Sequence, residues 1–264
     1  MLPTIASSSN PHVKRIKKLL SSTKFRREED LAVAEGIHLV QSYLQSDSVP
    51  SEYVYAESAL ENPEIKQIIE QLDQASIKHL VLADNLFSSI SSVHASVGIM
   101  MIFKPARPIY SFQKITNTAV LLEDIQDPGN IGAILRVVAA VGVRDVFLSA
   151  NCASTWSPKA LRSGMGAQFS LNLYEENNSI ELVKKINLPA VVTTLSVNSK
   201  SLYDTDLSKP VLWIFGNEGQ GVNCELIDLS PTHLSIPQAE NSVESLNVAT
   251  AAAVCLYEQY RQNL

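Results

Sequence analysis

Short apolar runs alternate with segments of helical periodicity along the first hundred residues. The runs that predict strands span residues 31–35, 52–56, 79–83 and 98–103. The segments that predict helices span 36–45, 63–72 and 85–93. This alternation predicts a compact α/β unit.

A second series of apolar runs follows a polar stretch that contains two prolines. The runs span 119–123, 145–149, 190–194, 211–215 and 234–236. Because they are almost uninterrupted, they are typical of parallel strands that are covered on both faces. We therefore expect a smaller α/β domain at 1–105, a linker at 106–117 and a doubly wound parallel-sheet domain at 118–264.

The composition is that of a folded globular protein, with 45% hydrophobic and 18% charged residues. No apolar run approaches the roughly 20 residues of a membrane helix, and residues 1–10 lack the apolar stretch of a secretory signal, so we expect a cytoplasmic protein. The cysteines and histidines show no disulfide or metal-ligand spacing, and we expect no metal. They are Cys152, Cys224, Cys255, His12, His38, His79, His94 and His233.

Charge is distributed unevenly between the amino terminus and the rest of the chain. The net charge is −6, yet residues 1–27 contain seven basic residues and no acidic residue. Such segregation is typical of a protein that presents one basic surface to a polyanion, although a solvated amphipathic helix would look the same. The basic residues are Lys14, Arg15, Lys17, Lys18, Lys24, Arg26 and Arg27.

Ligands of parallel α/β sheets bind at the carboxyl ends of strands, so we looked there for chemistry. After 119–123, a turn leads into a predicted helix with Asn130 suited to the N-cap and Gly142 to the position after the last turn. Arg136 is the only charge at 131–143. It is either exposed on an unusually apolar surface or partly buried with an anionic partner. The alanine-rich back face suggests a packing partner, such as a second subunit.

Two further loops follow later strands. Residues 216–221 read Gly-Asn-Glu-Gly-Gln-Gly, and their glycines allow the backbone to approach a ligand closely. The segment matches neither a Walker loop nor a dinucleotide fingerprint. It could equally be an ordinary glycine-rich turn. After 234–236, Ser245 suits the N-cap of an alanine-rich helix and places Asn247 in its first turn. A separate segment contains Lys159 and Arg162 beside a glycine pair.

Together these loops resemble, in order and spacing, the three motifs of the SpoU (TrmH) family of the SPOUT superfamily, whose members are RNA 2′-O-ribose methyltransferases. The matching segments are 130–136, 216–221, and 236–237 followed by 245–248. Residues 1–105 look like the ribosomal-protein-L30e-like domain that many members use to bind RNA.

The resemblance implies a trefoil knot in the second domain, S-adenosylmethionine as cofactor, a homodimer, and RNA as substrate, with ribosomal RNA favoured over transfer RNA. It implies that the cofactor contacts are Thr194, Leu195, Gly216, Asn217, Gly221, Ile236 and Leu246. The implied catalytic residues are Asn130, Arg136, Glu218, Ser245 and Asn247, with Arg136 holding a phosphate of the RNA and the group that takes the proton left open. The RNA contacts that we expect are Lys14, Arg15, Lys17, Lys18, Arg26, Arg27, Lys159 and Arg162.

One departure from the family pattern supports an alternative. The family commonly has a glycine shortly after Ile-Pro, whereas residues 238–241 here read Gln-Ala-Glu-Asn. A noncatalytic RNA-binding or ribosome-assembly factor that kept the fold would also fit, and cofactor binding separates the two hypotheses. A nucleotide-dependent oxidoreductase is disfavoured because no fingerprint loop is present.

Overall fold

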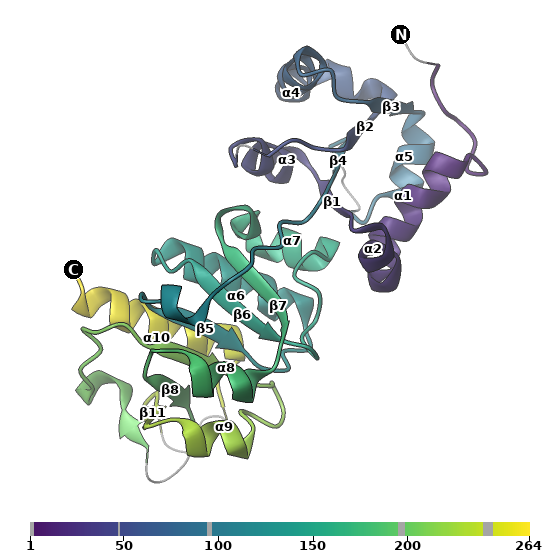
Figure 1. Ribbon diagram of the computed structural model, residues 1–264. Coiled ribbons are helices and arrows are strands. Elements are labelled where there is room, and N and C mark those ends of the chain that lie inside the picture. Colours follow the sequence, from purple (N-terminus) through teal and green to yellow (C-terminus); the bar gives the residue numbers. More distant parts are fainter. Residues whose placement is uncertain (1–2, 47, 94–96, 195–198, 240–244) are drawn as a thin grey trace. The chain divides into compact units, whose positions relative to one another are not determined.

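The computed structural model (Figure 1) describes residues 3–46, 48–93, 97–194, 199–239 and 245–264. The chain divides into two compact units. The first unit comprises 1–105 together with 156–169, and the second comprises 106–155 together with 170–264. Residues 156–169, which the sequence placed in the second domain, therefore make most of their contacts with the first unit.

The first unit is built on a four-stranded sheet in the order β1-β4-β2-β3. β4 pairs antiparallel with both β1 and β2, whereas β2 and β3 are parallel. The strands are β1 (Ala32–Glu35), β2 (Glu52–Ala56), β3 (His79–Leu82) and β4 (Ile99–Phe103). The helices are α1 (Pro11–Ser21), α2 (Thr23–Glu29), α3 (Ile37–Leu44), α4 (Pro63–Gln74), α5 (Asp84–Ile90) and α7 (Pro158–Gly164). All the strands predicted here are confirmed to within one residue at each end.

The second unit is a parallel sheet in the order β7-β6-β5-β10-β8-β11-β9. Its strands are β5 (Ala119–Leu122), β6 (Asp145–Ser149), β7 (Asn172–Asn177), β8 (Ala190–Thr193), β9 (Lys200–Ser201), β10 (Leu212–Phe215) and β11 (Thr232–Ser235). Its helices are α6 (Pro128–Ala140), α8 (Ser179–Lys185), α9 (Cys224–Leu229) and α10 (Val248–Gln262). The predicted parallel α/β architecture is confirmed.

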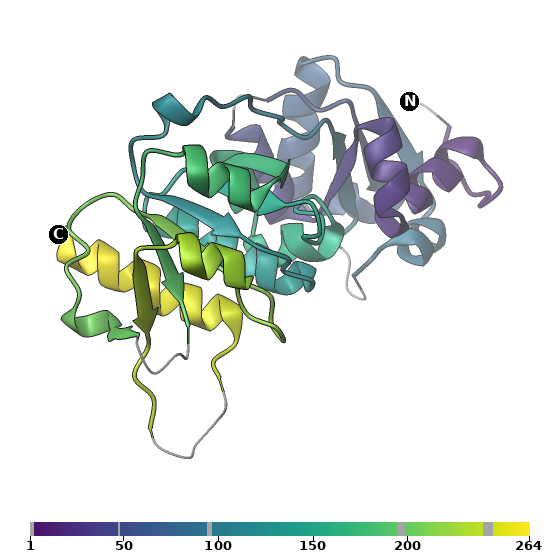
Figure 2. The ribbon, with the colours of Figure 1, turned by 60° about the horizontal axis from the view of Figure 1, so that its bottom comes forward.

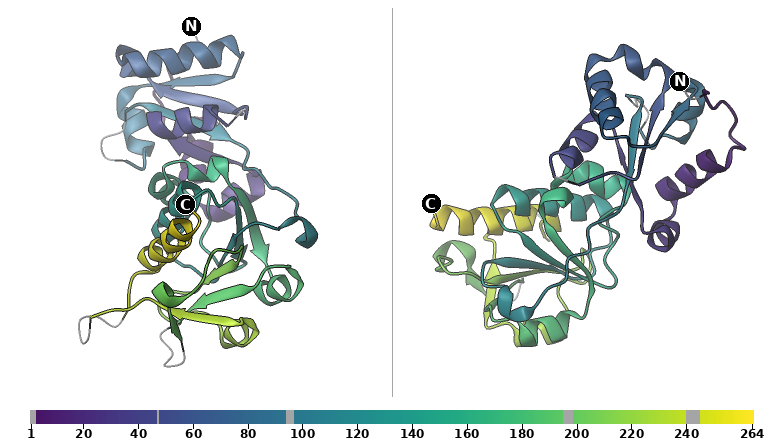
Figure 3. Two further views of the ribbon diagram at one scale, coloured as in Figure 1. Left: turned by 90° about the vertical axis from the view of Figure 1, so that its left-hand side faces the viewer. Right: turned by 45° about the horizontal axis from the view of Figure 1, so that its top comes forward.

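Helices cover both faces of this sheet. α6 and α10 pack side by side on one face, whereas α8 and α9 pack together on the other (Figure 2, Figure 3). Side chains alternate along β10, so Leu212 and Ile214 face α8 and α9, and Trp213 lies on the opposite side. The indole N–H of Trp213 donates to Oε1 of Gln259 in α10 at 2.7 Å. Burial on both faces explains why the central strands are nearly uninterrupted apolar runs.

Two helix starts differ from the sequence prediction. The N-cap of α6 is Asp127, three residues before the predicted N-cap Asn130, because Pro128 suits the first helical turn and the Asp127 carboxylate accepts from the N–H groups of Gly129 and Asn130. α10 is capped by Asn247 and not by Ser245. Both corrections matter, because the side chain of Asn130 is released from capping while Asn247 acquires that role.

Candidate active site at the carboxyl ends of the second sheet

A cavity of about 540 Å³ opens at the carboxyl ends of β8, β10 and β11. Its walls come from the segments that follow these three strands and from the start of α10. The volume lies within the range of about 300 to 1,000 Å³ that is usual for small-molecule sites, and the position is where ligands bind in such sheets. The cavity is therefore the candidate active site.

Most of the predicted catalytic and cofactor-binding residues line this cavity. They are Thr194, Gly216, Asn217, Glu218, Gly221, Ile236, Ser245, Leu246 and Asn247. Leu195 lies outside the described residues, and Asn130 and Arg136 are not part of the wall. The wall also includes Gln220, Gln238 and Ala251, to which the sequence prediction gave no role. Of these, Gln238 could have been noticed in the sequence, because it begins the segment 238–241 that departs from the family pattern.

The glycine loop after β10 is closely packed against itself. A Cβ at Gly216 would lie 2.5 Å from the carbonyl of Gly221 and from the nitrogen of Val222, so no side chain fits at this position. Asn217 holds the loop: its Oδ1 accepts from the N–H groups of Gly219 and Gln220, and its Nδ2 donates to the carbonyl of Asp124 at 2.8 Å. The side chain of Asn217 therefore holds the loop in place, and only its backbone is left for a ligand.

A chain of hydrogen bonds links the three motifs. Nδ2 of Asn247, at the start of α10, donates to Oδ1 of Asn130 at 3.0 Å. Nδ2 of Asn130 in turn donates to Oε1 of Glu218 at 2.9 Å. The structure thus brings together three of the five predicted catalytic residues, each from a different motif.

The direction of this chain is fixed by its two ends. At one end, Oδ1 of Asn247 accepts from the N–H groups of Ala249 and Thr250, which can only donate. At the other end, the ionised carboxylate of Glu218 can only accept. Flipping either amide would place two acceptors or two donors face to face, so each amide has one satisfactory orientation.

The Glu218 carboxylate also accepts from the backbone N–H groups of Gln126 and Asp127, both at 3.2 Å. Partial burial acts to raise the pKa of Glu218, but the hydrogen bonds from Asn130 and from these backbone groups outweigh it and hold the pKa below its ordinary value. Glu218 is therefore anionic near neutral pH and gives the cavity a fixed negative charge.

Arg136 takes no part in this series of hydrogen bonds. Its side chain is exposed on α6, and it forms no hydrogen bond or ion pair within the described ranges of the structure. Of the two alternatives left open by the sequence, the exposed arginine is the one observed. α6 packs against α10 of the same chain.

The predicted RNA-binding cations fall into two groups. Lys14, Lys17, Lys18, Arg27 and Lys159 are exposed. The other three, Arg15, Arg26 and Arg162, form hydrogen bonds or ion pairs within the first unit. The sequence predicted RNA contacts for these three, whereas each guanidinium is engaged by acceptors of the protein itself.

Arg26 is only 6% exposed, and its guanidinium donates to the carbonyl of Leu19 and to Oγ1 of Thr23. This burial corrects the expectation that it contacts RNA. Arg15 forms ion pairs with Glu29 at 3.2 Å and Glu52 at 2.6 Å. These acids offset its charge and fix its side chain on the fold.

Arg162 donates to Oγ of Ser92 at 2.7 Å, and Ser92 donates to the buried carboxylate of Glu35. This network attaches α7 to the segment after α5. Arg162, which the sequence predicted to contact RNA, is half-buried and makes this contact within the first unit.

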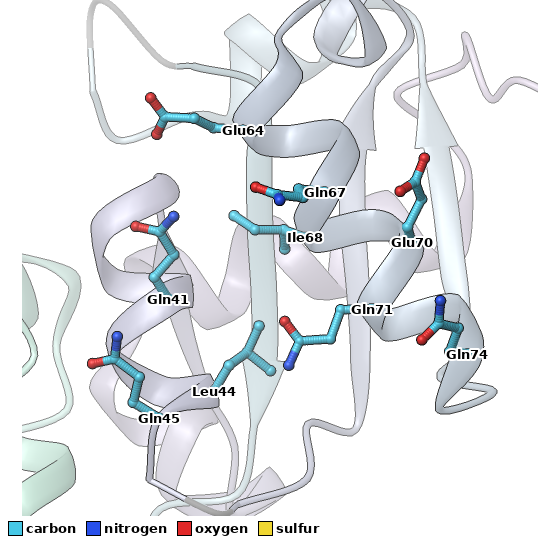
Figure 4. Close-up of a pocket in the computed structure, with 9 residues that line it drawn as sticks. All are labelled: Gln41, Leu44, Gln45, Glu64, Gln67, Ile68, Glu70, Gln71 and Gln74. Carbon is cyan, nitrogen blue, oxygen red and sulfur yellow. The ribbon is translucent and has the colours of Figure 1, made fainter.

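A second cavity lies between α3 and α4 of the first unit (Figure 4). Five glutamines, two glutamates, Leu44 and Ile68 line it, and no basic residue does. A polyanion gains nothing from such a wall, so this cavity is a poor candidate for RNA. In the described parts of the chain, no cluster of three His, Cys, Asp or Glu residues forms a metal site, and no helix has the length and apolarity to cross a membrane.

The parallel sheet and the cavity at its carboxyl edge define an α/β protein with a small-molecule site, where three motifs of the resembled methyltransferase family meet. The chain matches the SpoU rRNA Methylase family over residues 117–257 and the MRM3-like substrate binding domain over residues 10–100. It therefore belongs to the SpoU rRNA methylase family, and it is an RNA 2′-O-ribose methyltransferase whose cofactor is S-adenosylmethionine.

Full-length relatives and structures agree with this assignment. An uncharacterized tRNA/rRNA methyltransferase of Synechocystis sp. is 30% identical over 99% of this chain and 94% of its own length. The 23S rRNA (guanosine(2553)-2′-O)-methyltransferase of Bacillus subtilis is 29% identical over 96% of this chain and 97% of its own. The crystal structure of an AdoMet-bound rRNA methyltransferase from Sinorhizobium meliloti superimposes with a TM-score of 0.86 at 28% identity, covering 99% of this chain and 98% of that one.

Proposed function

We propose that the chain methylates a ribose 2′-hydroxyl of ribosomal RNA and that the cavity after β8, β10 and β11 holds its methyl donor. The names of the full-length relatives support the substrate class. The observation that carries the placement is the hydrogen-bonded chain from Asn247 through Asn130 to Glu218, because it joins all three family motifs at the wall of this cavity.

The residues of the cavity fit S-adenosylmethionine. When bound, this cofactor supplies an electrophilic methyl group on a positively charged sulfonium. The glycine at 216, where no Cβ fits, leaves backbone exposed for close approach, and the backbone near Thr194, Ile236 and Leu246 lines the same space. The anionic Glu218 favours a cation in the cavity. The contact expected from Leu195 remains a prediction outside the described residues.

Glu218 is better suited to positioning than to taking a proton. A carboxylate whose pKa lies below its ordinary value is a weak base near neutral pH, and three hydrogen bonds already occupy it. We propose that Glu218, Asn130 and Asn247 hold the target ribose of the RNA and the cavity wall in a fixed geometry. Ser245 lines the cavity, and we propose that it contacts the same ribose.

Arg136 supplies the positive charge for the RNA. An exposed guanidinium with no partner among the described residues is available to bind the phosphate next to the target nucleotide with two parallel hydrogen bonds. The bound phosphate or Arg136 itself then assists removal of the hydroxyl proton. Positioning of the poor hydroxyl nucleophile provides much of the rate enhancement.

The family also supports a trefoil knot and a homodimer, and we propose both for this chain. The knot would involve the loops after Thr194, Phe215 and Ile236, the first and third of which contain residues outside the described ranges. For the dimer, the remaining exposed part of α6 beside Arg136 offers a surface, since Ala140 is exposed and Ala133 and Val137 are only half-buried. Light scattering of the purified protein tests the dimer directly.

A methylation assay tests the proposed function. Purified protein, labelled S-adenosylmethionine and ribosomal RNA from a strain that lacks the gene should give label at one ribose, mapped as a 2′-O-methyl group. Ribosomal RNA from the parent strain, already modified, is the matched control and should accept little label. Cofactor binding without transfer to any RNA would support a noncatalytic RNA-binding or assembly factor instead.

A further inference from the structure

A further cavity of the second unit lies beside the candidate active site, at the carboxyl ends of β5 and β10. Its volume is about 700 Å³, and the glycine loop after β10 lines both this cavity and the one proposed for the cofactor. Gln126 also lines it, and the backbone N–H of Gln126 donates to Glu218. The cavity therefore adjoins the hydrogen-bonded residues that we propose to hold the target ribose.

Glu123, which directly follows β5, brings a carboxylate to the wall of this cavity. The residue is only 8% exposed. Its Oε2 accepts from the backbone N–H of Asn223 at 3.0 Å, whereas its Oε1 has no hydrogen-bond partner among the described residues. Oε1 is not one of the unpartnered atoms that water cannot reach, so it is accessible from the cavity. A nearly buried carboxylate with one accessible, unpaired oxygen indicates a ligand that supplies a donor.

The neighbouring carboxylate of Asp124 is already occupied within the protein. Its Oδ1 accepts from Oγ of Ser149 at 2.6 Å, and its Oδ2 accepts from Nδ2 of Asn151 at 3.3 Å. Asp124 therefore holds the wall together and adds negative charge to it. Of the two acids that line the cavity, Glu123 is the one with an oxygen available to a ligand.

This wall discriminates among the chemical groups of RNA. Two carboxylates repel a phosphate, so the cavity does not suit the RNA backbone. Bases are uncharged, and proteins read unpaired bases through their Watson–Crick edges. On that edge guanine presents N1–H and N2–H side by side, whereas adenine and cytosine carry a ring-nitrogen acceptor beside the amino group and uracil carries a carbonyl on each side of N3–H. Because an acceptor facing a carboxylate is unfavourable, guanine fits best.

We infer that this cavity holds the base of the methylated nucleotide and that Glu123 selects guanine by accepting a hydrogen bond from its Watson–Crick edge. The inference rests on the proposed function, which places the target ribose beside the cavity. Glu123 is a specificity-determining residue in this reading and takes no part in methyl transfer. Its loss should change the choice of base and leave cofactor affinity intact.

Glu123→Gln tests the inference at nearly constant volume. The N–H of Asn223 can only donate, so the amide turns its oxygen toward Asn223 and directs its NH₂ group to the place of Oε1. The substitution thus replaces an acceptor in the cavity by a donor. We expect kcat/KM for a ribosomal RNA fragment with guanosine at the mapped position to fall about 10- to 100-fold. Calorimetry should show unchanged affinity for S-adenosylmethionine.

The matched control is Glu225→Gln, which removes the same charge from an exposed position of α9 outside the cavity wall. It should change neither kcat/KM nor cofactor affinity. If Glu225→Gln lowered kcat/KM as much as Glu123→Gln does, a general effect of charge would explain the loss and overturn the inference.

A base substitution in the RNA separates selection from a structural role. Two fragments around the mapped ribose, one with guanosine and one with adenosine at that position, are methylated in parallel. The parent protein should prefer guanosine. Glu123→Gln should narrow or reverse this preference, because its NH₂ group can donate to N1 of adenine and opposes the N–H groups of guanine. A structural role would lower both rates by the same factor and overturn the inference.

Failure of the inference and failure of the proposed function give different results. If the parent protein methylates ribosomal RNA at a nucleoside other than guanosine, the role of Glu123 is wrong and the proposed function stands. An unchanged ratio of guanosine to adenosine methylation in a folded Glu123→Gln protein leads to the same conclusion. If the parent protein transfers no methyl group to ribosomal RNA, the proposed function fails and the inference fails with it.

Discussion

Asn247 and Asn130 are separated by 117 positions in the sequence, yet their side-chain amides are joined by a hydrogen bond of 3.0 Å. The bond connects the start of α10 with the first turn of α6, and the two helices pack side by side on one face of the sheet. Helix packing therefore sets the position of both amides. Because Asn247 also caps α10, the stability of that helix and the geometry of the site depend on the same side chain.

Asn247→Asp separates these two roles. A carboxylate still caps α10 and interacts favourably with the helix dipole, so the thermal midpoint should change by no more than about 3 °C, less than about 1 kcal/mol. It can no longer donate to Asn130, and flipping Asn130 would direct its oxygen at Glu218. We expect single-turnover methylation to slow by about 10- to 100-fold, equivalent to roughly 1.4 to 2.8 kcal/mol.

The control for this variant is Asn247→Ala, which loses both roles. It should slow methylation similarly and also destabilise the protein by about 1 kcal/mol, the usual cost of a lost N-cap. Equal turnover of Asn247→Asp and the parent protein would show that the hydrogen bond to Asn130 has no role in catalysis. Urea denaturation and single-turnover kinetics on the same preparations give both quantities.

Glu218 makes the stability of the protein depend on pH in the acid range. Its pKa is lower in the folded than in the unfolded chain, so the unfolded state binds more protons as pH falls. The stabilisation is fully present above the unfolded pKa of about 4.3 and is lost as pH falls through the folded pKa. Glu218→Gln should therefore be less stable than the parent at pH 7, with the difference shrinking below pH 4. Parallel denaturation curves from pH 3 to 7 measure it, and a constant difference would contradict the assignment.

Arg136→Ala should leave the fold and cofactor affinity intact, because Arg136 is exposed without a partner among the described residues and does not line the cavity. Turnover should fall by about 100- to 1,000-fold if a transition-state contact of roughly 3 to 4 kcal/mol is lost. Arg136→Lys should recover little if the guanidinium holds a phosphate with two hydrogen bonds. Near-normal turnover of Arg136→Ala, measured beside its cofactor affinity, would remove Arg136 from the mechanism.

Replacing Lys14, Lys17 and Lys18 by glutamine should weaken RNA binding without changing cofactor affinity. The slope of log affinity against log salt concentration should flatten by about 0.7 for each lost phosphate contact with single-stranded RNA. Arg15→Gln is the contrasting variant: because Arg15 pairs with Glu29 and Glu52, it should lower thermal stability more than it changes the salt slope. An unchanged slope in the lysine variant would make α1 a solvated surface helix.

The positions of the central strands, and therefore of the loops at their carboxyl ends, could be predicted from the sequence. A strand that is buried on both faces must be apolar throughout, which makes it easy to recognise. The apolar runs of β5 and β10 are of this kind, so the loops after them could be located and matched to family motifs. β7 escaped prediction since it is an edge strand with a mixed, half-exposed sequence, and β9 is only two residues long. Glu218 and Asn247 could be named as site residues, but their partners could not.

Only the tertiary structure decided which polar groups satisfy one another. The sequence determined the α/β class, the family and the cavity-lining loops, because these follow from local periodicity and from short contiguous motifs. It did not determine that Asp127 caps α6 and frees Asn130, that Arg26 is buried while Lys14 is exposed, or that Gln238 keeps an unsatisfied oxygen. Hydrogen bonds and burial depend on distances between residues far apart in the chain, and those distances exist only once the helices have packed on the sheet.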